Sequence, residues 1–331
     1  MKYHVFIVDS AEVPHGEDDS IEREVLQDCA NVQLLAVHSE EEFRRCSSDA
    51  DALILWHHLD VTAGMLAGLT KTRLIVRNGV GYDNVDIAAA GAAGIAVANV
   101  PDYGTEEVAD HTIALILALF RQLKPTLANV AKGNWDWRSG LAARRIRGNV
   151  LGIVGCGRIG TAMALRAKAL GFLVRFFDPY LPAGYEKGIG VQRVSTLDEL
   201  LAEADVLSIH APLTEETRHL IAAPQLKQMK RTAYLVNTAR GAVVSYQALH
   251  DALSQGIIAG AGLDVLEDEP FGAEEMQGLP NCLITPHSAF YSKESLIEMR
   301  QKSAQIVKAA LLHGQYENVV NRENLRACNG H

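Results

Sequence analysis

Three glycines and a later aspartate carry the clearest chemical signal in the sequence. Gly155, Gly157 and Gly160 have the spacing Gly-x-Gly-x-x-Gly, and Asp178 follows about 20 residues later. An apolar run before the glycines predicts a strand, and the segment after them predicts a helix. In that context the spacing is typical of a segment that binds a dinucleotide, and a glycine-rich turn without a ligand is the alternative.

Each of these residues has a physical task in a dinucleotide site. Gly155 permits a tight turn, Gly157 lets the backbone approach the pyrophosphate, and Gly160 lets the helix pack against the strand. The N–H groups at the start of the helix would bind phosphate oxygens. Asp178 would accept hydrogen bonds from the adenosine ribose and repel a 2′-phosphate, so we expect NAD in preference to NADP.

Polar residues also follow three later predicted strands. They are Arg240 in "LVNTARG", Asp264 and Glu269 in "LDVLEDEP", and His287 in "ITPHSAF". Ligands of open α/β sheets bind beyond the carboxyl ends of the strands, so we expect these side chains to converge on a nicotinamide. Taken singly, each has a plainer reading: a surface arginine, a solvated turn, or a histidine satisfied within the protein.

The arginine, glutamate and histidine together suit the reduction of a carbonyl group. Hydride transfer to the carbonyl carbon leaves negative charge on the oxygen, and a protonated His287 would donate a proton to it. Glu269 beside the ring would favour the imidazolium form. Arg240 presents a planar fork that matches a carboxylate.

A second candidate site lies nearer the N-terminus. In "RNGVGYDNVD", backbone N–H groups around Val80 and Gly81 would form an anion-binding nest for the substrate carboxylate, and Arg77 would add positive charge. An ordinary strand-to-helix turn is the alternative.

Alternating strands and helices must position these residues. Apolar runs predict a first series of strands at 3–9, 50–56, 72–79 and 94–101, with helix-compatible segments between them. A second series is predicted at 150–154, 173–177, 205–210, 233–237, 258–263 and 282–284. Helices are predicted at 105–123, which is apolar around most of its circumference, and at 293–314.

This pattern predicts an α/β protein of two Rossmann-like domains with parallel sheets. We expect a discontinuous, flavodoxin-like substrate domain of residues 1–101 plus 291–331, because nothing after the last predicted helix resembles a separate domain. Residues 102–290 would form a classical NAD-binding domain, with a cleft between the two.

Composition limits the possible partners and the compartment. The chain has 331 residues, a formal net charge of -9, 48% hydrophobic and 21% charged residues, which indicates a globular protein that repels nucleic acid and anionic membranes. We find no membrane span of 18 residues and no signal-peptide pattern. The five cysteines are scattered, so we expect no disulfide framework, no metal site and a cytoplasmic location. Cys156 is interpreted as a space-filling residue, with a reactive thiol as the alternative.

The sequence resembles the D-isomer-specific 2-hydroxyacid dehydrogenases. The resemblance rests on "GIVGCGRIG", "VNTARG", "AGLDVLEDEP" and "TPHSAFYS", and extends to "RNGVGYDNVDI" and "NVPDYGTEEVADH". Within the family, "FFDPYL" and "QRVSTLDELL" look most like the C-terminal-binding proteins, the NADH-dependent co-repressor branch.

The resemblance implies roles for individual residues. Arg240, Glu269 and His287 match the family's catalytic positions, and Asp264 matches a residue that orients the nicotinamide end. Phe290 stands where the co-repressor branch has a tryptophan in the substrate pocket, and Val80 stands where that branch has a small polar residue. Further cofactor contacts are predicted at Arg158, Ile159, His210, Ala211, Pro212, Thr217, Thr238 and Ala239.

We therefore expect an NAD-dependent oxidoreductase that interconverts a 2-keto acid and a D-2-hydroxy acid. The alternative is an NADH-sensing, co-repressor-like binding protein with weak or vestigial dehydrogenase activity. Formate oxidation is disfavoured, because those relatives carry glutamine at the position of Glu269. The family also implies a homodimer, in which the 105–123 helix and the "NWDW" loop contact the partner. Glyoxylate, hydroxypyruvate, a phosphorylated acid and a methylthio keto acid all remain possible substrates.

Overall fold

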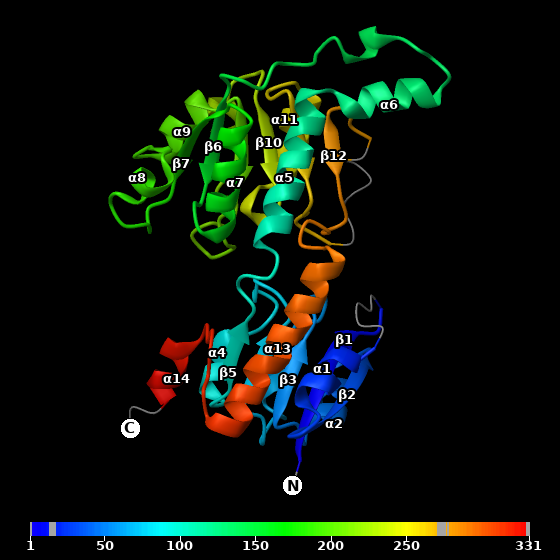
Figure 1. Ribbon diagram of the computed structural model, residues 1–331, viewed down its shortest axis with the longest axis vertical. Coiled ribbons are helices and arrows are strands. Elements are labelled where there is room, and N and C mark those ends of the chain that lie inside the picture. The colour runs from blue at the N-terminus through cyan, green and yellow to red at the C-terminus, as the bar shows by residue number, and fades with distance from the viewer. Residues whose placement is uncertain (1, 13–17, 270–275, 277, 329–331) are drawn as a thin grey trace. The chain divides into compact units, whose positions relative to one another are not determined.

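A computed structural model describes residues 2–12, 18–269, 276 and 278–328 of the chain. The chain divides into two compact units, each built around its own parallel sheet (Figure 1). The first unit contains residues 1–104 and 292–331, and the second contains residues 105–291. The C-terminal segment therefore belongs to the same unit as the N-terminal sheet.

The first unit has a five-stranded sheet in the order β2-β1-β3-β4-β5. This is the strand order of flavodoxin-like folds. Its strands are β1 (Tyr3–Ser10), β2 (Ala30–Val37), β3 (Ala52–Leu55), β4 (Leu74–Arg77) and β5 (Ala96–Asn99). β2 was not predicted from the sequence, because its outer positions are exposed and carry polar residues such as Asn31 and Gln33.

Helices cover both faces of this sheet. α1 (Ser20–Leu26) and α13 (Lys293–His313) pack together, and α13 also contacts β3 and β4. Side chains from α2 (Glu40–Ser47), α3 (Ala63–Leu66) and α4 (Ile87–Ala92) join a separate buried cluster. A buried ion pair joins α1 to α13, because Arg300 donates to both carboxylate oxygens of Glu22, at 2.8 and 2.6 Å. α14 (Arg322–Cys328) packs on α4.

The second unit has a seven-stranded parallel sheet in the order β12-β11-β10-β9-β6-β7-β8. The strands are β6 (Val150–Val154), β7 (Leu173–Phe177), β8 (Gln192–Arg193), β9 (Val206–Ile209), β10 (Tyr234–Asn237), β11 (Gly260–Leu263) and β12 (Cys282–Ile284). The order contains that of dinucleotide-binding folds, with one strand added. It reverses between β6 and β9, and such a switch point is where open α/β sheets bind ligands.

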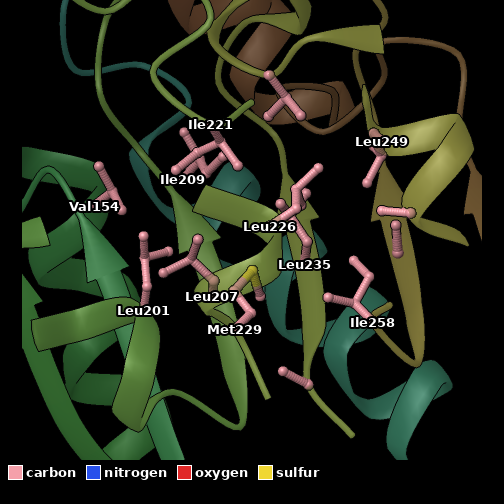
Figure 2. Close-up of a cluster of buried hydrophobic side chains, with 14 of the residues drawn as sticks. Val154, Leu201, Leu207, Ile209, Ile221, Leu226, Met229, Leu235, Leu249 and Ile258 are labelled. Atoms are coloured by element: carbon pink, nitrogen blue, oxygen red, sulfur yellow. The ribbon is translucent and has the colours of Figure 1, made fainter. Parts of the chain in front are cut away.

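Buried side chains fill both faces of the second sheet. α5 (Thr105–Phe120) and α7 (Arg158–Ala169) lie side by side on one face (Figure 1), over a cluster that includes Phe120 and Phe176. On the other face, α9 (Leu197–Glu203), α10 (Ala223–Gln228) and α11 (Tyr246–Ser254) contribute to the cluster that Figure 2 shows. The short α8 (Tyr185–Ile189) precedes β8.

The predicted helix 105–123 is interrupted. α5 ends at Phe120, Gln122 adopts a left-handed conformation with φ 53°, and α6 (Leu123–Ala131) continues after a bend of 67°. None of the described helices is by itself long and apolar enough to cross a membrane, although α5 and α6 together reach that length and composition.

α6 and the segment after it form a projecting arm (Figure 1). We define this arm as residues 123–141, which end in the short helix η1 (Trp137–Gly140). α6 has no buried residue. Trp135 and Trp137 of the arm are 93% and 78% exposed, so these rings do not pack within the chain.

Candidate active site

The predicted polar residues lie at the carboxyl ends of neighbouring strands in the second unit. Arg240 follows β10, Asp264 and Glu269 follow β11, and His287 follows β12. These three strands are adjacent and parallel in the sheet. The sheet topology therefore brings the four residues to one edge, as the sequence predicts.

His287 and Glu269 form a direct pair. Glu269 Oε2 lies 2.6 Å from His287 Nδ1, and Glu269 Oε1 accepts the backbone N–H of Leu266 at 2.8 Å. An ionised carboxylate only accepts hydrogen bonds, so His287 Nδ1 carries the proton of this contact. The imidazole can then exchange a proton with a ligand only through Nε2.

The environment of Glu269 favours its charged form. Burial raises the pKa of this carboxyl. The opposing effects are larger: the hydrogen bond and charge of His287, the Leu266 N–H and the charge of Arg240 all lower it, so the net pKa lies below the ordinary value. Glu269 is thus a carboxylate at neutral pH, and its negative charge faces the imidazole.

The backbone at His287 is held in an unusual conformation. Its φ is +50°, a value that residues other than glycine rarely adopt. The His287 N–H donates to the carbonyl oxygens of Asp264 and Thr285, at 2.8 and 3.1 Å. Phe290 packs edge-on against the His287 ring, with centroids 6.3 Å apart. These contacts fix the ring that the sequence singles out.

Asp264 is buried and supports the turn that carries His287. Its Oδ1 accepts the Thr285 hydroxyl at 2.5 Å and the Ser288 N–H at 2.9 Å, and its Oδ2 accepts the Ala289 N–H at 2.8 Å. The family resemblance implies that Asp264 orients the nicotinamide. In this structure its carboxylate also ties together the backbone on both sides of His287.

Arg240 projects from a tight turn after β10. The buried Asn237 closes this turn, since its side chain donates to the Arg240 carbonyl at 2.9 Å and accepts the Ala239 N–H at 3.0 Å. Gly241 follows in the short helix η2 (Gly241–Val243), and a Cβ there would lie 1.8 Å from the Leu266 carbonyl oxygen. Only glycine therefore lets the Arg240 turn approach the Leu266–Glu269 turn this closely.

The glycine-rich segment has the geometry of a phosphate-binding turn. Gly155 has φ +83°, and a Cβ there would lie 2.9 Å from the Ala211 backbone nitrogen. A Cβ on Gly160 would lie 2.2 Å from the Gly155 carbonyl oxygen, so this glycine allows the helix to contact the strand. A Cβ on Gly157 would meet no protein atom within 4 Å. The space beside Gly157, at the start of α7, therefore fits a dinucleotide pyrophosphate.

Asp178 lies at the end of β7, directly beside this turn. Its Oδ2 accepts the Cys156 N–H at 2.9 Å, and its Oδ1 accepts the Tyr180 N–H at 3.0 Å. The carboxylate is thus oriented by two backbone groups, and its remaining lone pairs suit ribose hydroxyls.

Other predicted cofactor residues lie near the same edge. Arg158 and Ile159 begin α7, and the loop after β9 carries His210, Ala211, Pro212 and Thr217. Desolvation lowers the pKa of His210 to about 4, so its imidazole is neutral, and its Nε2 lies 2.8 Å from the Ser208 hydroxyl. The Thr217 hydroxyl donates to the Pro212 carbonyl at 2.6 Å and fixes this loop.

Cys156 is fully buried in the glycine-rich turn. Burial raises the pKa of its thiol to about 11. The thiol is therefore protonated at neutral pH, which agrees with a space-filling role and not with a reactive one.

The first-unit residues predicted to bind substrate lie after β4. Arg77 is buried and donates from Nη1 to the Asn78 carbonyl at 2.6 Å. The carbonyls of Gly79 and Val80 accept the Val100 N–H and the Asn99 side-chain amide, at 3.0 and 2.6 Å. The loop that carries Val80 and Gly81 is thereby fixed to the end of β5.

Two residues of α5 escaped the sequence analysis. His111 Nε2 lies 2.9 Å from the Thr285 hydroxyl, and the Thr112 hydroxyl lies 2.8 Å from the Thr238 hydroxyl. Both stand in the polar first half of α5, together with Glu106, Glu107 and Asp110, so their polarity alone did not single them out. Their partners are more than a hundred residues away in sequence, so no local pattern could name them.

Comparison with known proteins decides the family. Residues 113–289 match the family model described as D-isomer specific 2-hydroxyacid dehydrogenase, NAD binding domain. The chain belongs to the D-isomer-specific 2-hydroxyacid dehydrogenase family. The resemblance inferred from the motifs is thus confirmed.

Two relatives in this family match most of the chain. D-3-phosphoglycerate dehydrogenase of Methanocaldococcus jannaschii is 36% identical over 301 residues, or 91% of this chain. C-terminal-binding protein 1 of Caenorhabditis elegans is 35% identical over 311 residues, or 89% of this chain. The aligned parts make up 57% and 42% of those two proteins. A glyoxylate reductase structure from Paecilomyes thermophila has a TM-score of 0.87 and 29% identity, covering 98% of this chain and 100% of that one.

Proposed function

We propose that this protein is an NAD-dependent dehydrogenase that interconverts a 2-keto acid and a D-2-hydroxy acid. The observation that carries the proposal is the His287–Glu269 pair, in which the carboxylate binds Nδ1 at 2.6 Å and leaves Nε2 as the proton-exchanging atom. The charge of Arg240 acts on the same carboxylate. Family membership supports the same reaction class.

Each residue then has a defined task in keto acid reduction. The nicotinamide of NADH, when bound, supplies the hydride. His287 Nε2–H donates a proton to the carbonyl oxygen as negative charge develops there, which is worth about 10²–10⁴-fold in rate. Glu269 stabilises the imidazolium before that transfer and holds the ring in one orientation. Arg240 binds the substrate carboxylate and carbonyl oxygen through its planar guanidinium.

The preference for NAD over NADP is part of the proposal. It rests on Asp178, because a carboxylate next to the glycine-rich turn accepts ribose hydroxyls but repels a 2′-phosphate. Thr238, Ala239 and Asp264 would contact the nicotinamide half of the cofactor.

We further propose that Arg77, Val80 and Gly81 bind the substrate carboxylate, and that Phe290 contacts the substrate's side chain. Phe290 packs against His287, which would place an apolar surface beside the reacting carbon. A substrate with an apolar side chain would suit that surface.

A homodimer formed through the projecting arm completes the proposal. The arm exposes large apolar side chains at Leu123, Leu127, Val130, Trp135, Trp137 and Leu141. A patch of this kind is normally covered by a partner.

A second candidate function is NADH sensing without significant turnover. The similarity to C-terminal-binding protein 1 favours it. A sensor needs the nucleotide site but no proton donor. Turnover that depends on the His287–Glu269 pair therefore distinguishes the dehydrogenase from the sensor.

The test is NADH oxidation, followed at 340 nm, with a panel of 2-keto acids. We expect turnover with at least one of them, and a fall of about 10²–10⁴-fold in His287→Ala with NADH affinity retained. Tight NADH binding without turnover across the panel would support the sensor. Turnover that survives His287→Ala would exclude His287 as the acid.

A further inference from the structure

Two adjacent residues of α5 reach the ends of two different strands in the second unit. His111 contacts Thr285, which follows β12, and Thr112 contacts Thr238, which follows β10. We propose that His111 and Thr112 are positioning residues that set the turn carrying His287 and the turn carrying Arg240 from one rigid helix. This inference rests on the proposed function, which makes His287 the proton donor and Arg240 the residue that binds the substrate carboxylate.

The single hydrogen of the Thr285 hydroxyl decides the direction of its hydrogen bond with His111. A hydroxyl has one hydrogen to donate, and the Thr285 hydroxyl donates it to Asp264 Oδ1 at 2.5 Å. Thr285 must therefore accept at its contact with His111, so His111 Nε2 carries a proton and donates it at 2.9 Å. His111 Nε2 also lies 3.7 Å from Asp264 Oδ1.

This chain of hydrogen bonds ends at the predicted acid. Asp264 accepts the N–H groups of Ser288 and Ala289, and its carbonyl accepts the His287 N–H. His287 itself has a left-handed backbone, which persists only when its surroundings determine it. Removing the His111 donor would therefore loosen the support on which the His287 turn depends.

The Thr112 connection is separate. Its hydroxyl donates to the Val108 carbonyl, one turn earlier in α5, at 2.6 Å, so its contact with Thr238 is one in which Thr238 donates. Both threonines are buried. Thr238 stands two positions before Arg240, in the turn that Asn237 closes. Thr112 thereby holds the start of the turn from which Arg240 projects.

The two connections predict different kinetic effects. Displacing the His287 turn weakens proton donation, which acts in the transition state and lowers kcat. Displacing the Arg240 turn weakens carboxylate binding in the ground state as well, which raises the KM for the keto acid. A purely structural role would instead lower the melting temperature and change both constants alike in both variants.

Matched pairs of variants separate these outcomes. We expect His111→Leu to lower kcat about tenfold with KM within about twofold of wild type, and His111→Gln, which keeps an amide donor, to restore most of it. We expect Thr112→Val, which has the same shape without the hydroxyl, to raise KM about tenfold, and Thr112→Ser to restore it. Wild-type kinetics in both His111→Leu and Thr112→Val would overturn the inference.

A second readout does not depend on turnover. In protein labelled at histidine ¹³Cε1, the His287 signal is identified by its loss in His287→Gln. It should shift in His111→Leu, remain in place in Thr112→Val, and return in His111→Gln. An unshifted signal in His111→Leu would overturn the His111 half. If the wild-type protein reduces no keto acid but the signal shifts as stated, the proposed function fails while the positioning role stands.

Discussion

Glu269 contacts the His287 ring with one carboxylate oxygen and the Leu266 backbone N–H with the other. Its Oε2 lies 2.6 Å from His287 Nδ1, and its Oε1 accepts the Leu266 N–H at 2.8 Å. A carboxylate held at both oxygens must break the Leu266 hydrogen bond as well before it rotates away from the imidazole. The pair is therefore a fixed element of the structure, and not a contact between two mobile side chains.

Replacing this carboxylate should reduce turnover. In Glu269→Gln the imidazolium loses its negative partner, so we expect kcat for keto acid reduction to fall by about 10²-fold or more. Glu267→Gln is the matched control, because Glu267 pairs with a different histidine, His219, at 2.5 Å. Steady-state kinetics at 340 nm measure both variants. Equal losses in the two would show that the effect is not specific to the Glu269 partner of His287.

The glycines of the nucleotide turn should respond differently to the same substitution. Gly157→Ala should fold with the wild-type melting temperature, because its Cβ meets no protein atom within 4 Å, but it should weaken NADH binding at least about tenfold by filling the pyrophosphate space. Gly160→Ala should lower the melting temperature, because its Cβ would lie 2.2 Å from the Gly155 carbonyl oxygen. Thermal unfolding and NADH fluorescence titration measure the two effects. Unchanged NADH affinity in Gly157→Ala would place the phosphates elsewhere.

Asp205 should contribute a pH-dependent part of the stability. Burial raises the pKa of Asp205, but the Val150 N–H and the charges of Lys230 and Arg144 outweigh burial, so its pKa is lowered in the folded protein. Its contribution is then full above the unfolded carboxyl pKa of about 4 and is lost as the pH falls through the lowered value.

Urea unfolding of Asp205→Asn tests this linkage. At pH 7 we expect a loss of about 1–3 kcal/mol in the free energy of unfolding. The difference from wild type should shrink as the pH falls below about 4. Asp60→Asn, at an exposed position, is the control and should change little. A difference that stays constant down to pH 2 would contradict the linkage.

The projecting arm should govern the oligomeric state. Trp135→Ser combined with Trp137→Ser removes the two most exposed aromatic rings of the arm, and we expect the proposed dimer to dissociate into monomers in light scattering. Leu312→Ser removes an exposed apolar side chain of α13, outside the arm, and should leave the mass unchanged. A double variant that keeps the dimeric mass would assign the interface to another surface.

Cys156 should resist thiol reagents in the native protein. Its thiol is buried and its pKa is raised to about 11, so little thiolate exists at pH 8. Peptide mapping after treatment with a disulfide reagent should find Cys156 modified only after unfolding. Cys46, which is partly exposed, should react in the folded state. Rapid labelling of Cys156 in the native protein would instead support the hypothesis that its thiol is reactive.

The sequence predicted the strands that are buried on both faces, because such strands are continuous apolar runs. β3, β4, β5, β9, β10 and β11 are buried at every position, and each lies within a predicted run. β6, β7 and β12 have the predicted bounds, although β7 and β12 are only partly buried. β2 escaped prediction because polar residues occupy its exposed positions and dilute that signal. The end of α5 escaped it as well, since Gln122 has no property that marks a helix break, and its side chain donates to the Tyr234 hydroxyl, 112 residues away in the sequence.

The site also contains residues that the sequence predicted and contacts that it did not. Arg240, Glu269 and His287 could be predicted because each follows a predicted strand and lies in a recognisable motif, and the motifs follow one another in the expected order. The Leu266 contact of Glu269, the close approach at Gly241 and the two α5 residues could not be named. The last two are contacts between segments far apart in the sequence, and the Leu266 contact, although it spans only three residues, depends on the folded shape of its turn.

The two hydrogen bonds that Asp178 accepts have a consequence for coenzyme engineering. An asparagine at this position would direct its NH₂ group at one of the two backbone N–H groups, of Cys156 and Tyr180, from which the carboxylate now accepts hydrogen bonds. A neutral side chain introduced to admit a third phosphate would thus weaken the contacts that Asp178 makes between the glycine turn and the end of β7. Redesign of this chain for the phosphorylated coenzyme must restore those contacts and cannot rely on one exchange.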